Sequence, residues 1–199
     1  MKSFAVALLL NMVSAKMGFG PCPQVDTMTD LDEARFAGNW YEVSRDSTPF
    51  MEVGYECTTQ QFVLNDDGDL DFYFRANFLH PLSGYNGIGG TTKNCGTSDE
   101  WTCQAYMPTT SARADKLYPL TFLDTDYDNY AISYACMDMM WDSMHYEYWN
   151  ILARDTTLAA EHQATAEAKI YEKVPGTDIN WFTKHVTEHW WCTYDWSLA

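Results

Sequence analysis

The sequence predicts an all-β domain with a single helix after its last strand. Between Asn39 and Arg154 the chain consists of short runs rich in Val, Tyr, Phe, Thr and Trp. Turn residues break these runs at intervals that suit antiparallel strands. A run rich in Ala, Glu, Lys and Gln comes only after the last of them. A series of strands followed by one helix favours a closed barrel, or a sandwich with an appended helix, over an alternating βαβ fold.

Eight runs are candidate strands, and the clearest turn lies between the second and the third. There, residues 65–69 contain an Asp-Gly pair typical of β-hairpins. In the third strand, Phe72, Phe74 and Ala76 share one face and polar residues alternate with them, so one face of the sheet is expected to be apolar. The eight runs are Trp40–Arg45, Gly54–Leu64, Leu70–Phe78, Tyr85–Lys93, Thr102–Met107, Lys116–Leu123, Tyr130–Met137 and Met144–Ala153.

The helix is predicted over Leu158–Val174, where the composition changes. Ala, Glu, Lys and Gln are good helix formers, and Glu161 lies near the start, where a negative charge is favourable. Pro175 and Gly176 form a stop signal directly after this run.

The length and composition suit one folded domain. The chain has 199 residues, of which 46% are hydrophobic and 16% aromatic, and its formal net charge is −16. A chain of this length buries roughly 70% of its unfolded surface, and the aromatic content argues against disorder. The negative charge and the lack of clustered Lys and Arg argue against nucleic acid and against an anionic membrane as partners.

The first 15 residues are expected to form a secretory signal peptide. Lys2 precedes a short apolar run from Phe4 to Leu10, and Ser14 and Ala15 are the small residues before the expected cleavage site. Residues 16–199 then form a single mature domain. No later run is long and apolar enough to span a bilayer. The sequence therefore predicts a secreted, extracellular protein without a transmembrane span.

The six cysteines after the expected cleavage site predict disulfide bonds. In an oxidising compartment an even number of cysteines indicates bridges, but six allow 15 pairings and the sequence alone does not choose among them. No Cys-x-x-Cys pair is present, which argues against zinc-ribbon and thioredoxin-like sites. The six are Cys22, Cys57, Cys95, Cys103, Cys136 and Cys192.

Three motifs follow one another at characteristic separations. Gly38-Asn39-Trp40 precedes the first strand, Thr125–Tyr130 reads Thr-Asp-Tyr-x-Asn-Tyr between two late strands, and Arg154 ends the last strand. With these motifs the sequence resembles the lipocalin family, and within it the branch of apolipoprotein D, insect bilin-binding proteins and crustacyanins. The resemblance runs from Cys22 to Cys192. It implies an eight-stranded antiparallel up-and-down β-barrel with a C-terminal α-helix.

The resemblance also implies how the barrel is closed and cross-linked. Trp40, which follows Gly38, would close the base, and Arg154 would lie over its indole in a cation–π contact worth about 0.5 to 2 kcal/mol. The pairings implied by the resemblance are Cys22 with Cys136 and Cys57 with Cys192, with Cys95 and Cys103 as the remaining pair.

As a lipocalin, the protein would bind and transport a small hydrophobic ligand in its barrel, without catalysis and without a catalytic cofactor. Fatty acids or sterols, retinoids, carotenoids and bilins are the candidate ligands. The interior of a barrel of eight strands is just wide enough to be filled by side chains or to hold one small molecule. Alternation along the strands, anchored on the Cys and Arg positions of the family, gives the expected ligand-binding residues of the inner face, although a slip of one residue would exchange each for its neighbour. They are Phe62, Phe72, Phe74, Leu120, Tyr134, Tyr146 and Tyr148.

Two other functions stay open at this point. One is an extracellular protein-interaction module with a filled barrel, which binds through its acidic surface or through the Met-rich turn around Trp141. The other is a lipocalin-fold enzyme acting on an isoprenoid or eicosanoid, although no free thiol or carboxylate pair stands out. No metal site is expected, because His185–His189 lies in a short tail and the aspartates after Leu123 lack the Gly and Glu of a calcium loop. The sequence leaves open whether the protein assembles with itself or with another chain.

Overall fold

The computed structural model describes residues 16–46, 55–68, 70–78, 85–93, 102–106, 117–177, 183–185, 190–194 and 196. The eight predicted strands correspond to β2 through β9 and the predicted helix to α3, with bounds that differ by a few residues. The signal peptide predicted over the first 15 residues lies outside the described part. The strands are β1 (Lys16–Phe19), β2 (Gly38–Asp46), β3 (Tyr55–Leu64), β4 (Leu70–Phe78), β5 (Tyr85–Lys93), β6 (Thr102–Tyr106), β7 (Leu117–Thr125), β8 (Tyr130–Met139), β9 (Met144–Ala153) and β10 (Thr183–His185), and the helices are α1 (Glu33–Phe36) and α3 (Ala160–Lys173).

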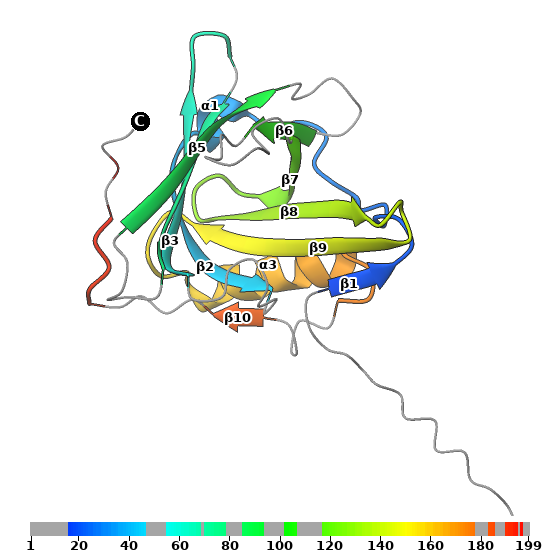
Figure 1. Ribbon diagram of the computed structural model, residues 1–199. Coiled ribbons are helices and arrows are strands. Elements are labelled where there is room, and N and C mark those ends of the chain that lie inside the picture. Colours follow the sequence, from blue (N-terminus) through cyan, green and yellow to red (C-terminus); the bar gives the residue numbers. More distant parts are fainter. Residues whose placement is uncertain are drawn as a thin grey trace, which may run out of the picture.

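The strands form one antiparallel sheet that curls into a barrel (Figure 1). Each strand from β2 to β9 pairs with the next in the chain, and β9 pairs back with β2, where Tyr41 lies opposite Ala153. This last pairing joins the two ends of the series, so the up-and-down barrel is confirmed and a sandwich is not formed. Beyond it, β1 pairs with residues 144–147 of β9 and β10 with residues 44–46 of β2.

Near the base of the barrel, β8 and β9 carry apolar side chains on both faces because each face is covered. Ile132 and Ile151 are opposite each other on the outer face and belong to a cluster that includes Ile170 of α3. The neighbouring pair, Ala131 and Leu152, points to the inner face and belongs to the cluster inside the barrel. The helix thus covers the outside of these strands, and the barrel encloses their inside.

Trp40 closes one end of the barrel as the family resemblance implied. Its side chain is fully buried, and its Nε1 donates a hydrogen bond to the carbonyl of Phe36, 3.0 Å away. The guanidinium carbon of Arg154 lies 3.7 Å from the centre of the Trp40 ring, and Arg154 also donates to the carbonyls of Phe36 and Tyr127. Gly38 has a φ of +114°, and a Cβ there would lie 3.0 Å from Nη1 of Arg154. Glycine is therefore the residue that lets the arginine reach the tryptophan.

Asp126 organises the turn between β7 and β8. Its Oδ1 accepts hydrogen bonds from the backbone N–H groups of Asp128, Asn129 and Tyr130, at 3.1, 2.8 and 3.0 Å. Asp124 accepts a hydrogen bond of 2.8 Å from the hydroxyl of Tyr130. The alternating aspartates thus stabilise a hairpin, in agreement with the reading of this segment as a turn.

Replacing Asp126 by alanine is expected to lower the free energy of unfolding by about 2 kcal/mol near neutral pH, because hydrogen bonds to a charged group are lost. Burial by itself raises the pKa of this carboxyl, but the hydrogen bonds from Tyr130, Asn129 and Asp128 together lower the pKa below its usual value. The stabilisation is therefore complete above the unfolded pKa of about 3.9 and is lost as the pH falls through the folded pKa. Urea unfolding of both proteins at stepwise lower pH should show the difference shrinking in acid.

The exposed Asp66, in the β3–β4 turn, provides the control for this experiment. Asp66→Ala is expected to change the free energy of unfolding by less than about 0.5 kcal/mol. A difference between Asp126→Ala and the parent that persists undiminished in acid would contradict the assigned role of the carboxylate.

Two disulfides fasten the ends of the chain to the barrel. Cys22 is bonded to Cys136, and Cys57 is bonded to Cys192, as the resemblance implied. Cys95 lies outside the described residues, so its pairing with Cys103 stays a prediction.

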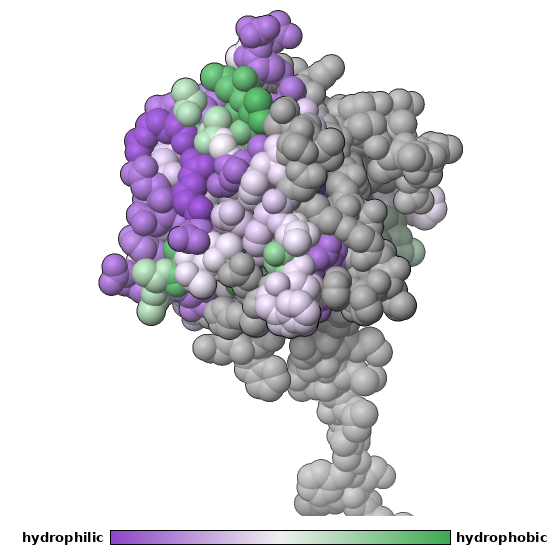
Figure 2. Space-filling model, turned by 90° about the vertical axis from the view of Figure 1, so that its left-hand side faces the viewer, coloured by the Kyte–Doolittle hydropathy of each residue, from purple (hydrophilic) through white to green (hydrophobic). Residues whose placement is uncertain are grey.

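The C-terminal segment after the second disulfide lies against the outer face of β2. The ring of Tyr41 lies 4.9 Å from that of Tyr194 and 5.5 Å from that of Trp196. Figure 2 shows the left-hand side of the molecule, where hydrophilic residues cover much of the coloured surface and hydrophobic residues form smaller areas.

Candidate functional site

The register of the strands shows which side chains face the inside of the barrel. Trp40, Gln60 and Phe74 lie in one row across β2, β3 and β4. Since side chains directly opposite each other in a sheet share a face, the inward position of Trp40 fixes that of the other two. The same reasoning places Tyr146 and Tyr148 of β9 on the inner face, in the same series as Leu152.

The aromatic side chains at the base of the barrel are fully buried, whereas some inward residues above it are not. At the base, Phe36, Phe62 and Phe122 are fully buried and contact one another, with ring centres 4.3 to 5.9 Å apart. Further along the strands, Phe74 and Tyr148 also face inward but are only half-buried. Protein atoms therefore seal the base and leave apolar surface uncovered on the wall above it.

Most of the predicted ligand-binding residues lie on the inner face, at two different depths. Phe62 and Phe72 belong to the base cluster, and Phe74 and Leu120 pack against it. Tyr146 and Tyr148 come from β9, with their ring centres 5.9 Å apart. This placement puts Phe62 and Phe72 in the floor and the other four residues on the wall.

The prediction that Tyr134 faces inward is wrong. Tyr134 pairs with Trp149 and belongs to the outer cluster beneath α3. Its hydroxyl donates a hydrogen bond of 2.6 Å to Glu147. Burial, and then this hydrogen bond, raise the pKa of the Tyr134 hydroxyl. The physical reason for the error is alternation: Cys136, two residues further on, bonds to Cys22 outside the barrel, so Tyr134 must share that outer face.

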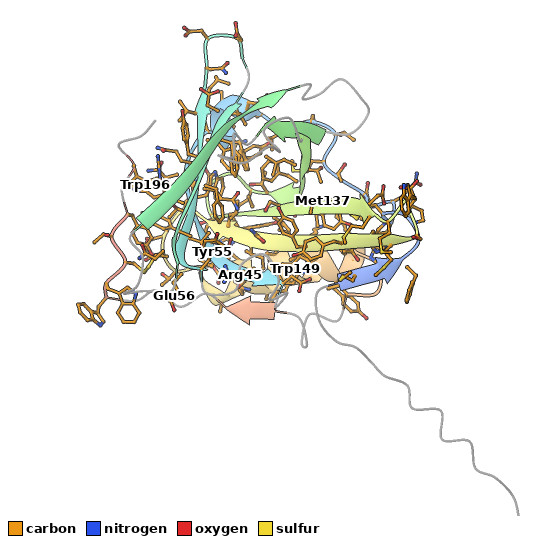
Figure 3. All side chains as sticks on the ribbon, in the orientation of Figure 1. Arg45, Tyr55, Glu56, Met137, Trp149 and Trp196 are labelled. Carbon is orange, nitrogen blue, oxygen red and sulfur yellow. A yellow bond between two sulfur atoms is a disulfide. The ribbon has the colours of Figure 1, made fainter. Side chains whose placement is uncertain are left out.

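The inner face also carries polar residues that the sequence did not reveal. Nη1 of Arg45 donates a hydrogen bond of 2.8 Å to Glu42, and Nδ2 of Asn150 donates one of 2.9 Å to the other carboxylate oxygen. Nη2 of Arg45 donates to the carbonyl of Tyr55, 3.0 Å away, and Figure 3 shows these two residues beside each other. We call Glu42, Arg45 and Asn150 the polar triad.

A bulge in β2 explains why the polar triad escaped prediction. Glu42 pairs with Leu152 and Arg45 with Asn150, and the register shifts between them at Val43. Residues three apart in a regular strand face opposite sides, but the extra residue brings Glu42 and Arg45 to the same side. The available signal was a run of three polar residues, Ser44-Arg45-Asp46, within a strand. Strict alternation from Trp40, however, would assign Arg45 to the outer face.

The polar triad balances its own charge. The side chains of Glu42 and Arg45 are 0% and 3% exposed, and burying one charge without the other would be very costly. Both carboxylate oxygens accept hydrogen bonds. The interior therefore offers a compensated ion pair rather than an open charge.

In the part of the chain that the structure describes, no group of three or more His, Cys, Asp or Glu side chains is arranged to hold a metal ion. The same residues include no helix with the length and apolar character needed to cross a membrane. Residues 186–189 of the His-x-x-Glu-His segment lie outside the described ranges.

Comparison with known proteins identifies relatives over most of the chain. No family model matches the sequence. Apolipoprotein D of Cavia porcellus is 28% identical over 160 residues, which span 78% of this chain and 80% of the relative. Apolipoprotein D of Mus musculus is 27% identical over 142 residues, 71% of this chain and 70% of the relative.

Solved structures with this fold agree. Insecticyanin from the tobacco hornworm Manduca sexta superposes with a TM-score of 0.72 at 20% identity, over 91% of this chain and 94% of that one. This match shows the fold. The chain has the lipocalin fold, and its sequence relatives are apolipoprotein D proteins. Lobster apocrustacyanin A1 has the same lipocalin fold, with a TM-score of 0.61 at 19% identity over 86% of this chain and 92% of that one.

The lipocalin fold agrees with the local structure of the chain. The Trp40–Arg154 contact, the turn organised by Asp126 and both described disulfides lie where the motifs of the family implied. Above the base, the inner face carries the half-buried Phe74 and Tyr148 as well as the polar triad.

Proposed function

We propose that this lipocalin is secreted and carries a small hydrophobic ligand inside its barrel, without catalysis. One observation carries the proposal: the base is sealed, while inward-facing Phe74 and Tyr148 above it keep part of their surface uncovered. When a ligand covers apolar surface that protein atoms leave exposed, burial of that surface stabilises the complex by about 25 cal/mol per Å². Apolipoprotein D relatives support a ligand-binding and transport role.

The wall residues are the proposed ligand contacts. Phe74, Leu120, Tyr146 and Tyr148 would line the bound molecule, and Phe62 and Phe72 would form the floor beneath it. A lipid, a retinoid, a carotenoid or a bilin has the extended or planar apolar shape that such aromatic walls accept. Secretion is supported by the two disulfides, which form and persist in oxidising compartments.

A second candidate, a protein-interaction module, is favoured by a group of exposed apolar side chains. Trp141 is 96% exposed in the turn between β8 and β9, next to the exposed Met140. Phe19 of β1 lies opposite Met144 and is 91% exposed. Residues of this kind are typical of interaction surfaces. Failure of every barrel ligand to bind would favour this second function.

Replacing Phe74 by glutamate is expected to weaken ligand binding at least about tenfold, because a charge would be placed on the apolar wall. The protein should be titrated with retinol, palmitic acid and biliverdin, following quenching of tryptophan fluorescence and confirming stoichiometry by native mass spectrometry. The ligand that binds the parent most tightly is then compared between variants.

Leu64→Glu is the matched control, since Leu64 ends the neighbouring strand β3 and is 43% exposed. It is expected to bind as the parent does. Equal affinities of Phe74→Glu and the parent for a ligand that binds would rule out the assigned wall.

A further inference from the structure

Two buried side-chain oxygen atoms of β3 lack a hydrogen-bond partner. Oε1 of Gln60 and Oγ1 of Thr58 find none among the residues that the structure describes. The two residues are 4% and 2% exposed. A buried polar atom without a partner is destabilising, and native proteins rarely keep one. Its presence inside a barrel calls for an explanation.

Gln60 faces the part of the interior where a ligand would lie. It is paired with Trp40 on β2 and with Phe74 on β4, so its amide is directly above the sealed base and beside the half-buried wall. Thr58 lies two residues further along β3, beside the bulge at Cys57, where alternation does not fix the direction of a side chain. Gln60, in the regularly paired part of the strand, therefore carries the argument.

The neighbouring charges do not require a charged ligand. Glu42 is already bound by Arg45 and Asn150, and Arg45 also donates to the carbonyl of Tyr55. The group that remains unmet is neutral and accepts a hydrogen bond. A carboxylate can only accept, whereas a hydroxyl or an N–H donates.

We propose that the ligand is a neutral amphiphile that enters polar end first and donates a hydroxyl or N–H hydrogen bond to Gln60. Its apolar part then runs along Phe74 and Tyr148, away from the base. The proposal rests on the function proposed above and specifies its ligand class: an alcohol or amide, rather than a fatty acid or a plain hydrocarbon.

Matched probe pairs that differ only in the donor test this proposal. Retinol and retinyl methyl ether form one pair, titrated by tryptophan quenching. Hexadecanol and methyl hexadecyl ether form the other, measured by displacement of N-phenyl-1-naphthylamine. At least one alcohol is expected to bind about tenfold more tightly than its ether, the usual effect of one well-made hydrogen bond. Gln60→Met should bring the alcohol to the affinity of the ether and leave the ether unchanged.

The adjacent residue provides a control with the same substitution on the other face. Oε1 of Gln61 accepts from Arg75, and its Nε2 donates to Asn39, on the outside of the barrel. Gln61→Met should therefore keep the preference for the alcohol but lower the urea midpoint. Gln60→Met, and Gln60→Leu as a second variant, should keep or raise the midpoint of the ligand-free protein, because they remove an unpartnered oxygen.

The outcomes separate this inference from the function on which it rests. If alcohols and ethers bind equally, or if the preference survives Gln60→Met, the carrier function stands and the role of Gln60 is overturned. Loss of stability in both Gln60 variants would also overturn it, since the oxygen would then have a structural partner. If no probe of either pair binds and the wider ligand panel also fails, the carrier function falls and the inference falls with it.

Discussion

Replacing Trp40 by alanine is expected to lower the free energy of unfolding by about 3 to 5 kcal/mol, the range found when a large buried aromatic side chain is truncated. Trp40 is fully buried, stacks on Phe36 with ring centres 5.1 Å apart and lies beneath the guanidinium of Arg154. The truncation leaves a cavity at the base and removes the cation–π partner. Urea unfolding followed by circular dichroism measures the change.

Trp141→Ala is the control, because Trp141 is 96% exposed. The same chemical truncation there should change the free energy of unfolding by less than about 0.5 kcal/mol. Similar losses at both positions would show that the base does not depend on its tryptophan, and the account of the sealed end would have to be abandoned.

Replacing Glu42 by leucine is expected to lower the free energy of unfolding by about 3 to 5 kcal/mol, because the buried guanidinium of Arg45 would lose the carboxylate with which it forms an ion pair. Asn150 would lose its acceptor in the same variant. The loss is measured by urea unfolding at neutral pH.

The double variant Glu42→Leu with Arg45→Met provides the decisive comparison. Removing both charges is expected to cost less than removing Glu42 alone, since neither charge then has to be buried unpaired. If the two single losses add up in the double variant, Glu42 and Arg45 do not stabilise each other, and the interior of the barrel is not charge-compensated as described.

The sequence predicted the long elements because their patterns repeat over many residues. The eight barrel strands and α3 each span enough positions for alternation or composition to be recognised. By contrast, β1 has four residues, β10 three and α1 four, too few for a period to show. The two short strands form because they pair with strands of the barrel: β1 pairs with β9, and β10 pairs with β2.

The correct placements lie where strands alternate without interruption, although one such strand, β8, was still assigned to the wrong face. Alternation predicted the correct face for Phe62 and Phe72, where β3 pairs regularly with β4. It also predicted the correct face for Tyr146 and Tyr148, where β9 pairs regularly with β8. Tyr134 was placed on the wrong face. The inward polar residues were missed because of β-bulges. The register shifts at Val43 in β2 and again near Cys57 in β3, where φ is +54°. A sequence does not announce where a strand gains one residue, so inward polar side chains beyond a bulge go unnoticed.

The two disulfides also limit how far the chain could be stretched if all its non-covalent structure were lost. The shortest covalent path from Cys22 to Cys192 follows the backbone to Cys57 and then crosses the Cys57–Cys192 disulfide. That stretch spans at most about 120 Å when fully extended. The strands from β4 onward lie outside this shortest path, within covalently closed loops, so they would bear no tension. An oxidised molecule pulled by its ends would therefore lengthen far less than its number of residues suggests, and reduction would release the remainder.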